Sequence, residues 1–136
     1  MKKLILYILI LCPLFCFIGC DKLETNGDFA GMWQLTEWKN LADGQIVADK
    51  HDGIYYSVQL DLMAFNGKDQ YLARFRRTSD SLFIGTVYHG PKDDIVGYDE
   101  LAKYGVPADG KFAIERLTKQ ALILRTDDVR LTFRKY

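Results

Sequence analysis

The stretch FAGMWQLTEW, residues 29–38, decides the fold that we expect for this chain. It places Gly31 two residues before Trp33 and is rich in aromatic side chains. Glycine lets the backbone turn sharply where a strand begins and pass close to a large buried ring. The stretch therefore predicts the first strand of a closed β-barrel, with Trp33 in its core.

The following sequence predicts further strands without helices between them. In residues 54–65, apolar side chains alternate with polar ones, which places one set on a single face of one half-buried strand: Tyr56, Val58, Leu60 and Leu62. Asp43-Gly44 and Asn66-Gly67 are typical of tight hairpin turns. We expect the other strands at about 45–48, 70–77, 82–89, 111–117, 121–126 and 129–135. The pattern predicts an all-β, antiparallel up-and-down meander of about eight strands.

The connection at residues 90–109 interrupts this rhythm and holds two of the three prolines. Residues 99–104 predict one short helix, because Gly105 and then Pro107 follow in the order typical of a helix end. We expect this helix to plug or cover one end of the barrel.

The Gly-x-Trp opening, the meander and the ending LTFRKY at residues 131–136 together resemble the lipocalin and calycin barrels, and in particular the small lipocalin-like lipoproteins of Gram-negative bacteria. The resemblance implies a lipocalin-like barrel over residues 29–136. It also implies that Trp33 packs at the closed end, with an arginine of the last strand over its indole. Arg134 is the expected partner and Arg130 the other choice. The chain is shorter than full-size lipocalins and lacks their disulfide and long terminal helix, and an open β-sandwich of the same meander is the alternative fold.

The N-terminal residues predict export. Lys2 and Lys3 precede an apolar run at residues 4–18, which is short for a membrane-spanning helix and typical of a signal peptide. The run ends at Gly19-Cys20, which resembles the lipobox of bacterial lipoproteins. The resemblance implies a signal peptide at 1–19, acylation of Cys20 and a polar tether at 20–28. We expect the protein in the cell envelope, lipid-anchored to the outer membrane; the alternative is an uncleaved membrane anchor.

Removal of 19 residues from the 136 would leave 117, enough for one domain with a modest core. Loss of Lys2 and Lys3 leaves 16 Lys and Arg against 18 Asp and Glu, a formal charge of about −2 that does not suggest a nucleic-acid partner. Cys12 and Cys16 leave with the signal, so an acylated Cys20 would leave no thiol for disulfides, catalysis or metal binding.

Catalytic chemistry is not indicated by the sequence. It has no hydrolase, phosphate-binding or calcium-loop motif, and His51 and His89 are isolated and fit surface positions. The connection at residues 90–109 also holds an acidic cluster, which consists of Asp93, Asp94, Asp99 and Glu100. We interpret this cluster as part of a solvated loop, and a calcium site is the alternative. We expect no enzyme activity, no cofactor and no metal.

Aromatic residues dominate the predicted interior, and they either line a ligand cavity or simply fill a small barrel. The expected cavity wall is Tyr56, Val58, Leu60, Tyr71 and Phe75. The expected function is binding of a hydrophobic or amphipathic small molecule. The alternative is a protein- or glycan-interaction module with a filled barrel. A basic stripe, Arg74, Arg76 and Arg77, fits a solvated outer face, with contact to an anionic lipid head group or to an acidic partner as the alternatives.

Overall fold

The computed structural model describes residues 26–90 and 94–136. The expected signal peptide, Cys20, residues 21–25 of the tether and Asp93 lie outside the described residues. Within the described part, no helix is long and apolar enough to cross a membrane.

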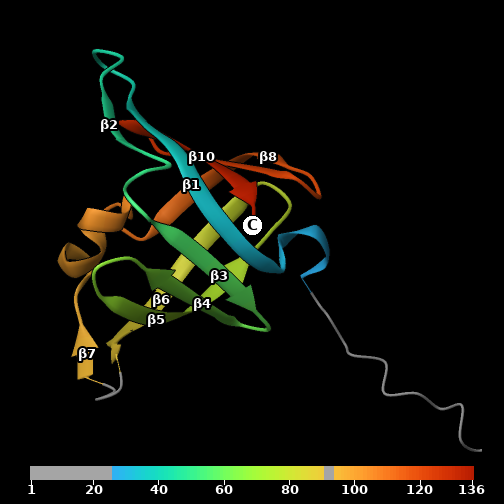
Figure 1. Cartoon of the computed structure of the whole chain (residues 1–136). Helices are drawn as coiled ribbons and strands as arrows, with labels where there is room; N and C mark the ends of the chain where they lie inside the picture. Colours follow the sequence, from blue (N-terminus) through green and yellow to red (C-terminus); the bar gives the residue numbers. More distant parts are fainter. Residues whose placement is uncertain (1–25, 91–93) are drawn as a thin grey trace, which may run out of the picture.

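Ten antiparallel strands are found in the described residues, and eight of them close into a barrel (Figure 1). The strands are β1 (Gly31–Asn40), β2 (Ile46–Asp49), β3 (Tyr55–Gln59), β4 (Leu62–Asn66), β5 (Gln70–Arg77), β6 (Ser81–His89), β7 (Asp94–Val96), β8 (Lys111–Leu117), β9 (Ala121–Arg125) and β10 (Val129–Lys135). The barrel order is β1-β3-β4-β5-β6-β8-β9-β10, and β10 pairs with β1 to complete it. Two short strands lie outside this circuit, because β2 pairs with β1 and β7 with β6. The predicted meander and barrel are confirmed.

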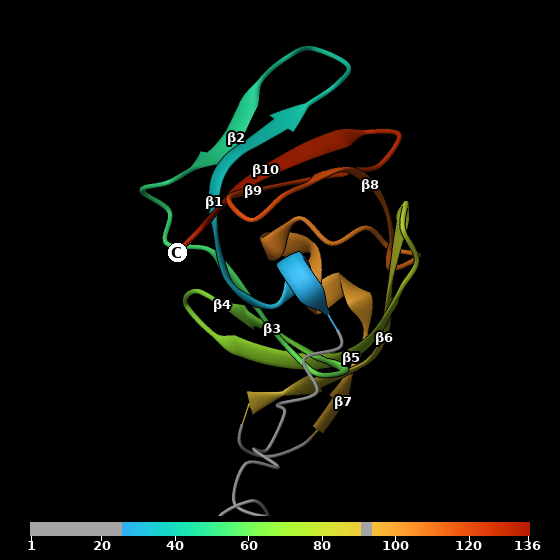
Figure 2. The same cartoon turned by 90° about the vertical axis from the view of Figure 1, so that its right-hand side faces the viewer.

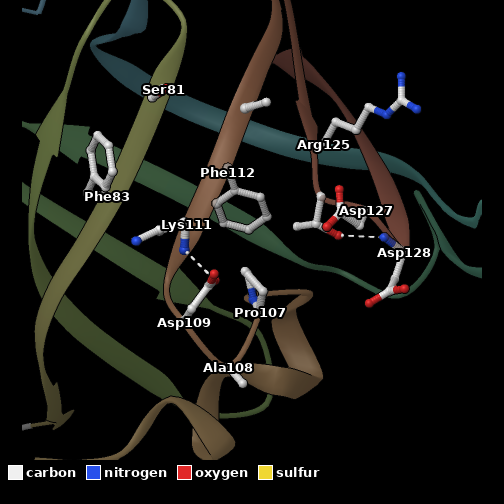
Figure 3. Close-up of a pocket in the computed structure, with 12 residues that line it drawn as sticks. Ser81, Phe83, Pro107, Ala108, Asp109, Lys111, Phe112, Arg125, Asp127 and Asp128 are labelled. Atoms are coloured by element: carbon white, nitrogen blue, oxygen red, sulfur yellow. Dashed lines mark hydrogen bonds between the residues drawn. The ribbon is translucent and has the colours of Figure 1, made fainter.

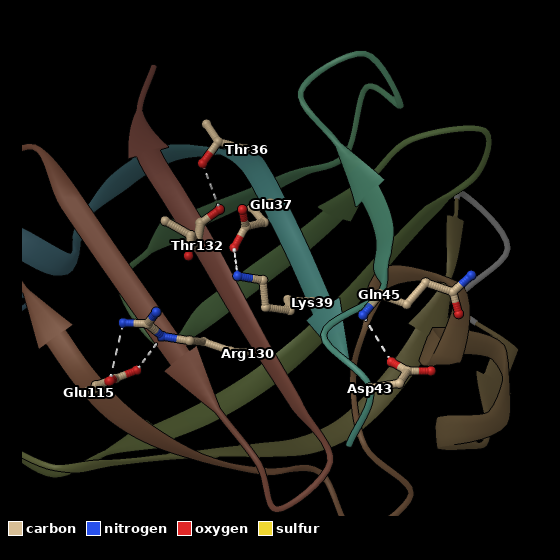
Figure 4. A network of polar contacts seen from close by, with 8 residues as sticks. All are labelled: Thr36, Glu37, Lys39, Asp43, Gln45, Glu115, Arg130 and Thr132. Carbon is tan, nitrogen blue, oxygen red and sulfur yellow. Dashed lines mark hydrogen bonds and ion pairs between the residues drawn. The ribbon is translucent and has the colours of Figure 1, made fainter. Parts of the chain in front are cut away.

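The closing pair β1 and β10 runs from Trp33 opposite Lys135 to Asn40 opposite Val129. The register shifts at Thr36, which lies opposite no residue of β10; its hydroxyl donates to the Thr132 carbonyl at 3.1 Å (Figure 4). Polar side chains cover the outer face here. The Arg130 guanidinium donates to both Glu115 oxygens, at 2.8 and 3.2 Å, so it ties β10 to β8 across β9.

The prediction of one continuous strand over residues 54–65 is wrong. β3 ends at Gln59 and β4 begins at Leu62, so Leu60 and Asp61 form a two-residue turn. Leu60 takes a positive φ of 53° and its side chain is 54% exposed, while Met63 and Phe65 take the interior positions of β4. Alternation missed this turn because leucine is neither a usual turn residue nor a usual residue at positive φ.

Two short 3-10 helices close opposite ends of the barrel. The first is η2 (Gly27–Phe29), which lies across one end in Figure 2 and buries Phe29 completely. The second is η4 (Tyr98–Tyr104), which agrees with the predicted helix and buries Leu101 and Tyr104. It ends at Gly105, whose φ of 87° is the left-handed conformation that favours glycine. We call these the η2 end and the η4 end.

Candidate functional site

The barrel interior is occupied by the chain's own aromatic side chains. Tyr56 is completely buried, with its ring centroid 4.7 Å from that of Phe65 and 4.6 Å from that of Phe133. Its hydroxyl donates to the Tyr104 carbonyl at the end of η4, at 2.5 Å. Burial raises the pKa of Tyr56 well above its usual value, so the phenol stays neutral and acts as a donor. The centre of the barrel is therefore packed by side chains.

Tyr104, the last residue of η4, packs against the aromatic side chains of this core. Its ring centroid lies 5.9 Å from that of Tyr71 and 6.3 Å from that of Phe65. Its hydroxyl donates to the Asp69 carbonyl and accepts from the Asp69 amide at 3.2 Å, which fixes η4 to the β4–β5 turn. Desolvation is the main reason that the pKa of Tyr104 is raised.

A cluster of polar side chains lies at the surface beside η4. The Lys103 ammonium donates to the Asp69 carboxylate at 2.7 Å and to the Tyr71 hydroxyl at 3.1 Å, and Tyr71 donates to Glu100 at 2.9 Å. The hydrogen bond from Lys103, with its charge, lowers the pKa of Asp69, and the bonds to Asp69 and Tyr71 raise the pKa of Lys103. His89 stacks on Tyr71 with a centroid distance of 4.8 Å. These hydrogen bonds hold η4 against the barrel. This role of Glu100 and Lys103 was not predicted from the sequence.

The structure separates the five predicted wall residues. Tyr56, Val58 and Tyr71 lie inside the barrel and are buried in the core. Phe75 is half-buried and packs edge-on against Phe29 at 5.5 Å, and Leu60 is exposed in its turn. Leu60 and Phe75 instead border a surface groove of about 350 Å³ at the η2 end, so the five side chains do not form one wall.

Trp33 is completely buried at the η2 end, and its indole nitrogen donates to the Phe29 carbonyl at 2.9 Å. The prediction that Arg134 covers the indole is wrong. The Lys135 ammonium lies 4.1 Å from the Trp33 ring centroid, while the Arg134 guanidinium donates to the Gln34 side chain at 2.7 Å. Arg130, the other choice, is paired with Glu115.

The signal for Lys135 is present in the sequence. Alternation along β10 places position 135 on the same face as a buried series of this strand, Leu131 and Phe133. Gly31 completes the arrangement, because its φ is 107° and a Cβ there would lie 3.3 Å from the Lys135 nitrogen. Desolvation lowers the pKa of Lys135.

A groove of about 700 Å³ opens where β6 and β8 diverge. These strands pair over three residue pairs only, from Ser81 opposite Ala113 to Phe83 opposite Lys111. Figure 3 shows the Phe112 ring between β6 and the β9–β10 turn, above Pro107. We call this opening the seam groove. Its apolar lining is Phe83, Pro107, Ala108, Phe112 and Ala113, and its charged rim is Asp109, Lys111, Arg125, Asp127 and Asp128.

The seam groove was not predicted, because it arises from the divergence of two strands that are distant in sequence. Its geometry offers an apolar floor with charged groups of both signs around it, which suits an amphipathic molecule. The described residues contain no group of three His, Cys, Asp or Glu side chains placed to hold a metal ion.

The sequence matches the family described as the lipocalin-like domain over residues 14–136. The chain belongs to this lipocalin-like family. This fold is compatible with the binding of a small molecule by the barrel. A search of curated proteins found no match.

Solved structures share this lipocalin-like fold. The crystal structure of a lipocalin-like protein from Bacteroides uniformis is 25% identical, with a TM-score of 0.59 over 81% of this chain and 100% of that chain. An uncharacterized protein from Bacteroides eggerthii is 24% identical, with a TM-score of 0.52 over 79% and 98%. A protein from Burkholderia xenovorans, solved by NMR, is 21% identical, with a TM-score of 0.55 over 78% and 81%.

Proposed function

We propose that this lipocalin-like protein is a non-enzymatic, lipid-anchored component of the bacterial cell envelope that binds an amphipathic small molecule in the seam groove. The proposal rests on a difference between the barrel interior, which is filled, and the seam groove, which is open. Tyr56, Phe65 and Tyr104 pack together inside the barrel, whereas Phe83 and Phe112 line an opening of about 700 Å³.

The groove has the composition that such a ligand needs. Apolar parts of the ligand would lie against Phe83, Pro107 and Ala108, which keep exposed surface, and contact would remove that surface from water; Phe112 is buried beneath them. Its polar parts would meet the rim, where Lys111 and Arg125 supply donors and Asp127 and Asp128 supply acceptors. Rim groups of both signs favour a ligand with several polar groups over a simple fatty chain.

The packed interior supports a second candidate, a module that binds a protein or a glycan through its outer surface. Such a module has no need of an internal cavity, and the contacts of Tyr56 and Tyr104 leave the interior occupied. Native mass spectrometry of protein purified from its host separates the two. A bound small molecule supports the first candidate, and a ligand-free protein that captures a polymer or a second protein supports the other.

Filling the groove tests where a small molecule binds. Ala113 lines the groove and is exposed on β8, so Ala113→Trp adds volume without removing a core contact, and an aromatic residue suits a strand. We expect the affinity for the apolar fluorescent probe N-phenyl-1-naphthylamine to fall about tenfold or more, which corresponds to about 1.4 kcal/mol. The matched control is Thr86→Trp on β6, where the side chain is exposed and outside the groove. Equal affinities for the two variants would contradict binding in the groove.

Anchoring is tested separately by metabolic labelling with a fatty-acid probe. The expected result is that the full-length protein is labelled and sediments with membranes, and that Cys20→Ala loses both properties. Labelling of Cys20→Ala would contradict the lipoprotein proposal.

A further inference from the structure

Exposed apolar side chains gather at both ends of the barrel. Leu60 and Leu62 lie at the η2 end and are 54% and 39% exposed, and Ile46 and Val47 of β2 lie toward the η4 end and are 46% and 48% exposed. An exposed pair of large apolar side chains next to charged groups is typical of a surface that meets a membrane or another protein. The two ends differ in their charges and in their distance from Asn26, where the described chain begins.

Basic side chains flank the exposed pair at the η2 end. Arg74 lies opposite Leu62 in the β4–β5 register and pairs with Asp61, while its side chain stays 61% exposed. Arg76 is also exposed, and its guanidinium lies 4.6 Å from the Phe83 ring centroid. The Arg77 guanidinium lies over Phe29 at 5.3 Å. A row of arginines beside apolar side chains suits the anionic head groups of a lipid surface.

Acidic side chains outnumber basic ones around the other pair, because Glu37, Asp43, Asp49 and Asp52 lie there together with two basic residues, Lys39 opposite Ile46 and Lys50 after Asp49. Asp43 and Asp49 lie on either side of Ile46 and Val47 in the sequence, and Asp52 accepts a hydrogen bond from the Asp49 amide at 2.7 Å. A negatively charged lipid surface repels this group of carboxylates. Charge therefore favours the η2 end for contact with an anionic membrane.

The place where the described chain begins favours the same end. The Asn26 side chain donates to the Leu60 carbonyl at 2.6 Å, so the described chain begins beside the exposed pair. Asn26 lies six positions after Cys20, which gives the intervening chain a maximum reach of about 20 Å. β2 pairs with β1 some seven residues beyond Gly31, about 23 Å along the strand. Even a fully extended tether would fall short of β2 if it ran back along the barrel, whereas the η2 end lies within its reach.

We propose that the η2 end is a membrane-docking surface, in which Leu60 and Leu62 enter the head-group region of the bilayer and Arg74 and Arg76 contact anionic lipid phosphates. This proposal rests on the lipid anchor at Cys20. It adds an orientation to that anchor, with η2 facing the lipid and η4 facing away. A single lipid-modified site combined with basic and apolar contacts then holds the domain in one orientation.

Spin labels test this orientation in the full-length, lipidated protein. Acylation of Cys20 blocks its thiol, so Leu60→Cys and Val47→Cys each offer one labelling site in the mature chain. The proteins are reconstituted in vesicles of phosphatidylethanolamine and phosphatidylglycerol, and the ratio of collisions with oxygen to collisions with a nickel chelate reports the depth of each label. We expect this ratio to be severalfold higher at position 60 than at position 47.

Reversing the charges at the η2 end provides a second test of the orientation. Arg74→Glu combined with Arg76→Glu should lower the ratio at position 60 toward its value in water. The matched control, Lys50→Glu combined with Lys68→Glu, reverses two exposed charges away from the η2 end and should leave the ratio unchanged. Equal aqueous ratios at positions 60 and 47, with Cys20 acylated by mass spectrometry, would overturn the docking surface and leave the anchor intact. An unacylated Cys20 would overturn both proposals.

Discussion

The two ends of this barrel are closed by different physical means. At the η2 end, Phe29 and Trp33 are buried completely and Lys135 covers the indole. At the η4 end, Tyr104 and Leu101 are buried, but a network of hydrogen bonds through Asp69 and Lys103 holds the helix in place. Apolar burial gives large stabilisation that does not depend on pH, whereas exposed ion pairs contribute little and titrate. Because the η4 end depends in part on groups that titrate, we expect acid to open the η4 end before the η2 end.

Trp33→Ala should produce the largest effect. The substitution removes a completely buried indole and its hydrogen bond to Phe29, so we expect a loss of about 3–5 kcal/mol in the free energy of unfolding. Chemical denaturation measures it. A loss below about 1 kcal/mol would show that the ring is not part of the core. It would also contradict the large contribution of apolar burial at the η2 end.

Tyr56→Phe tests how firmly the η4 end is joined to the core. The substitution keeps the ring but leaves the buried Tyr104 carbonyl without the hydroxyl that donates to it, which should cost about 1–3 kcal/mol. Tyr55→Phe is the matched control, because the Tyr55 hydroxyl is half-buried and accepts a weaker bond from Gln34 at 3.3 Å. Equal losses in the two variants would contradict a special role for the bond to η4.

A double-mutant cycle identifies the cation over Trp33. We expect a coupling energy of about 0.5–2 kcal/mol between Trp33→Phe and Lys135→Met, because a partly buried ammonium lies on the face of the indole. The same cycle with Arg134→Met should be additive within about 0.5 kcal/mol, since Arg134 contacts Gln34 instead. Coupling to Arg134 and none to Lys135 would reverse the assignment.

Acid should weaken the η4 end selectively. The pKa of Asp69 is lowered by Lys103 from its usual value of 3.8, so the stabilisation is fully present above that value and is lost as the pH falls toward the lower pKa of the folded state. The pKa of Lys103 is raised, and this residue therefore stays charged throughout the acidic range. Amide hydrogen exchange of residues 98–104 between pH 5 and pH 3 should accelerate relative to β1 beyond the intrinsic dependence of exchange on pH. Asp69→Asn should abolish this additional change, and a variant that kept it would exclude Asp69 as the cause.

The strand pattern could be predicted where the two faces of a strand differ in polarity. β5, β9 and β10 agree with their predicted ranges because alternation is strong there. The turn at Leu60 was missed because an apolar residue occupies it, and β7 because three residues carry too little pattern.

The predicted site was less accurate than the predicted strands. Lys135 was overlooked as the partner of Trp33 because the family resemblance implies an arginine there, although alternation along β10 places position 135 on the same face as Leu131 and Phe133. The seam groove depends on how far β6 and β8 separate and on the path of the chain through Pro107. Such distances between remote segments follow from tertiary packing, and no local pattern encodes them.

The position of a bound ligand tests the central claim of a filled barrel with a site at its seam most directly. Amide chemical shifts of the isotope-labelled protein are followed by NMR while N-phenyl-1-naphthylamine is added. We predict that the largest shifts occur at Phe83, Ala108 and Ala113 around the seam groove. Largest shifts at Phe65, with loss of the Tyr56 contact to Tyr104, would place the ligand inside the barrel and contradict the account.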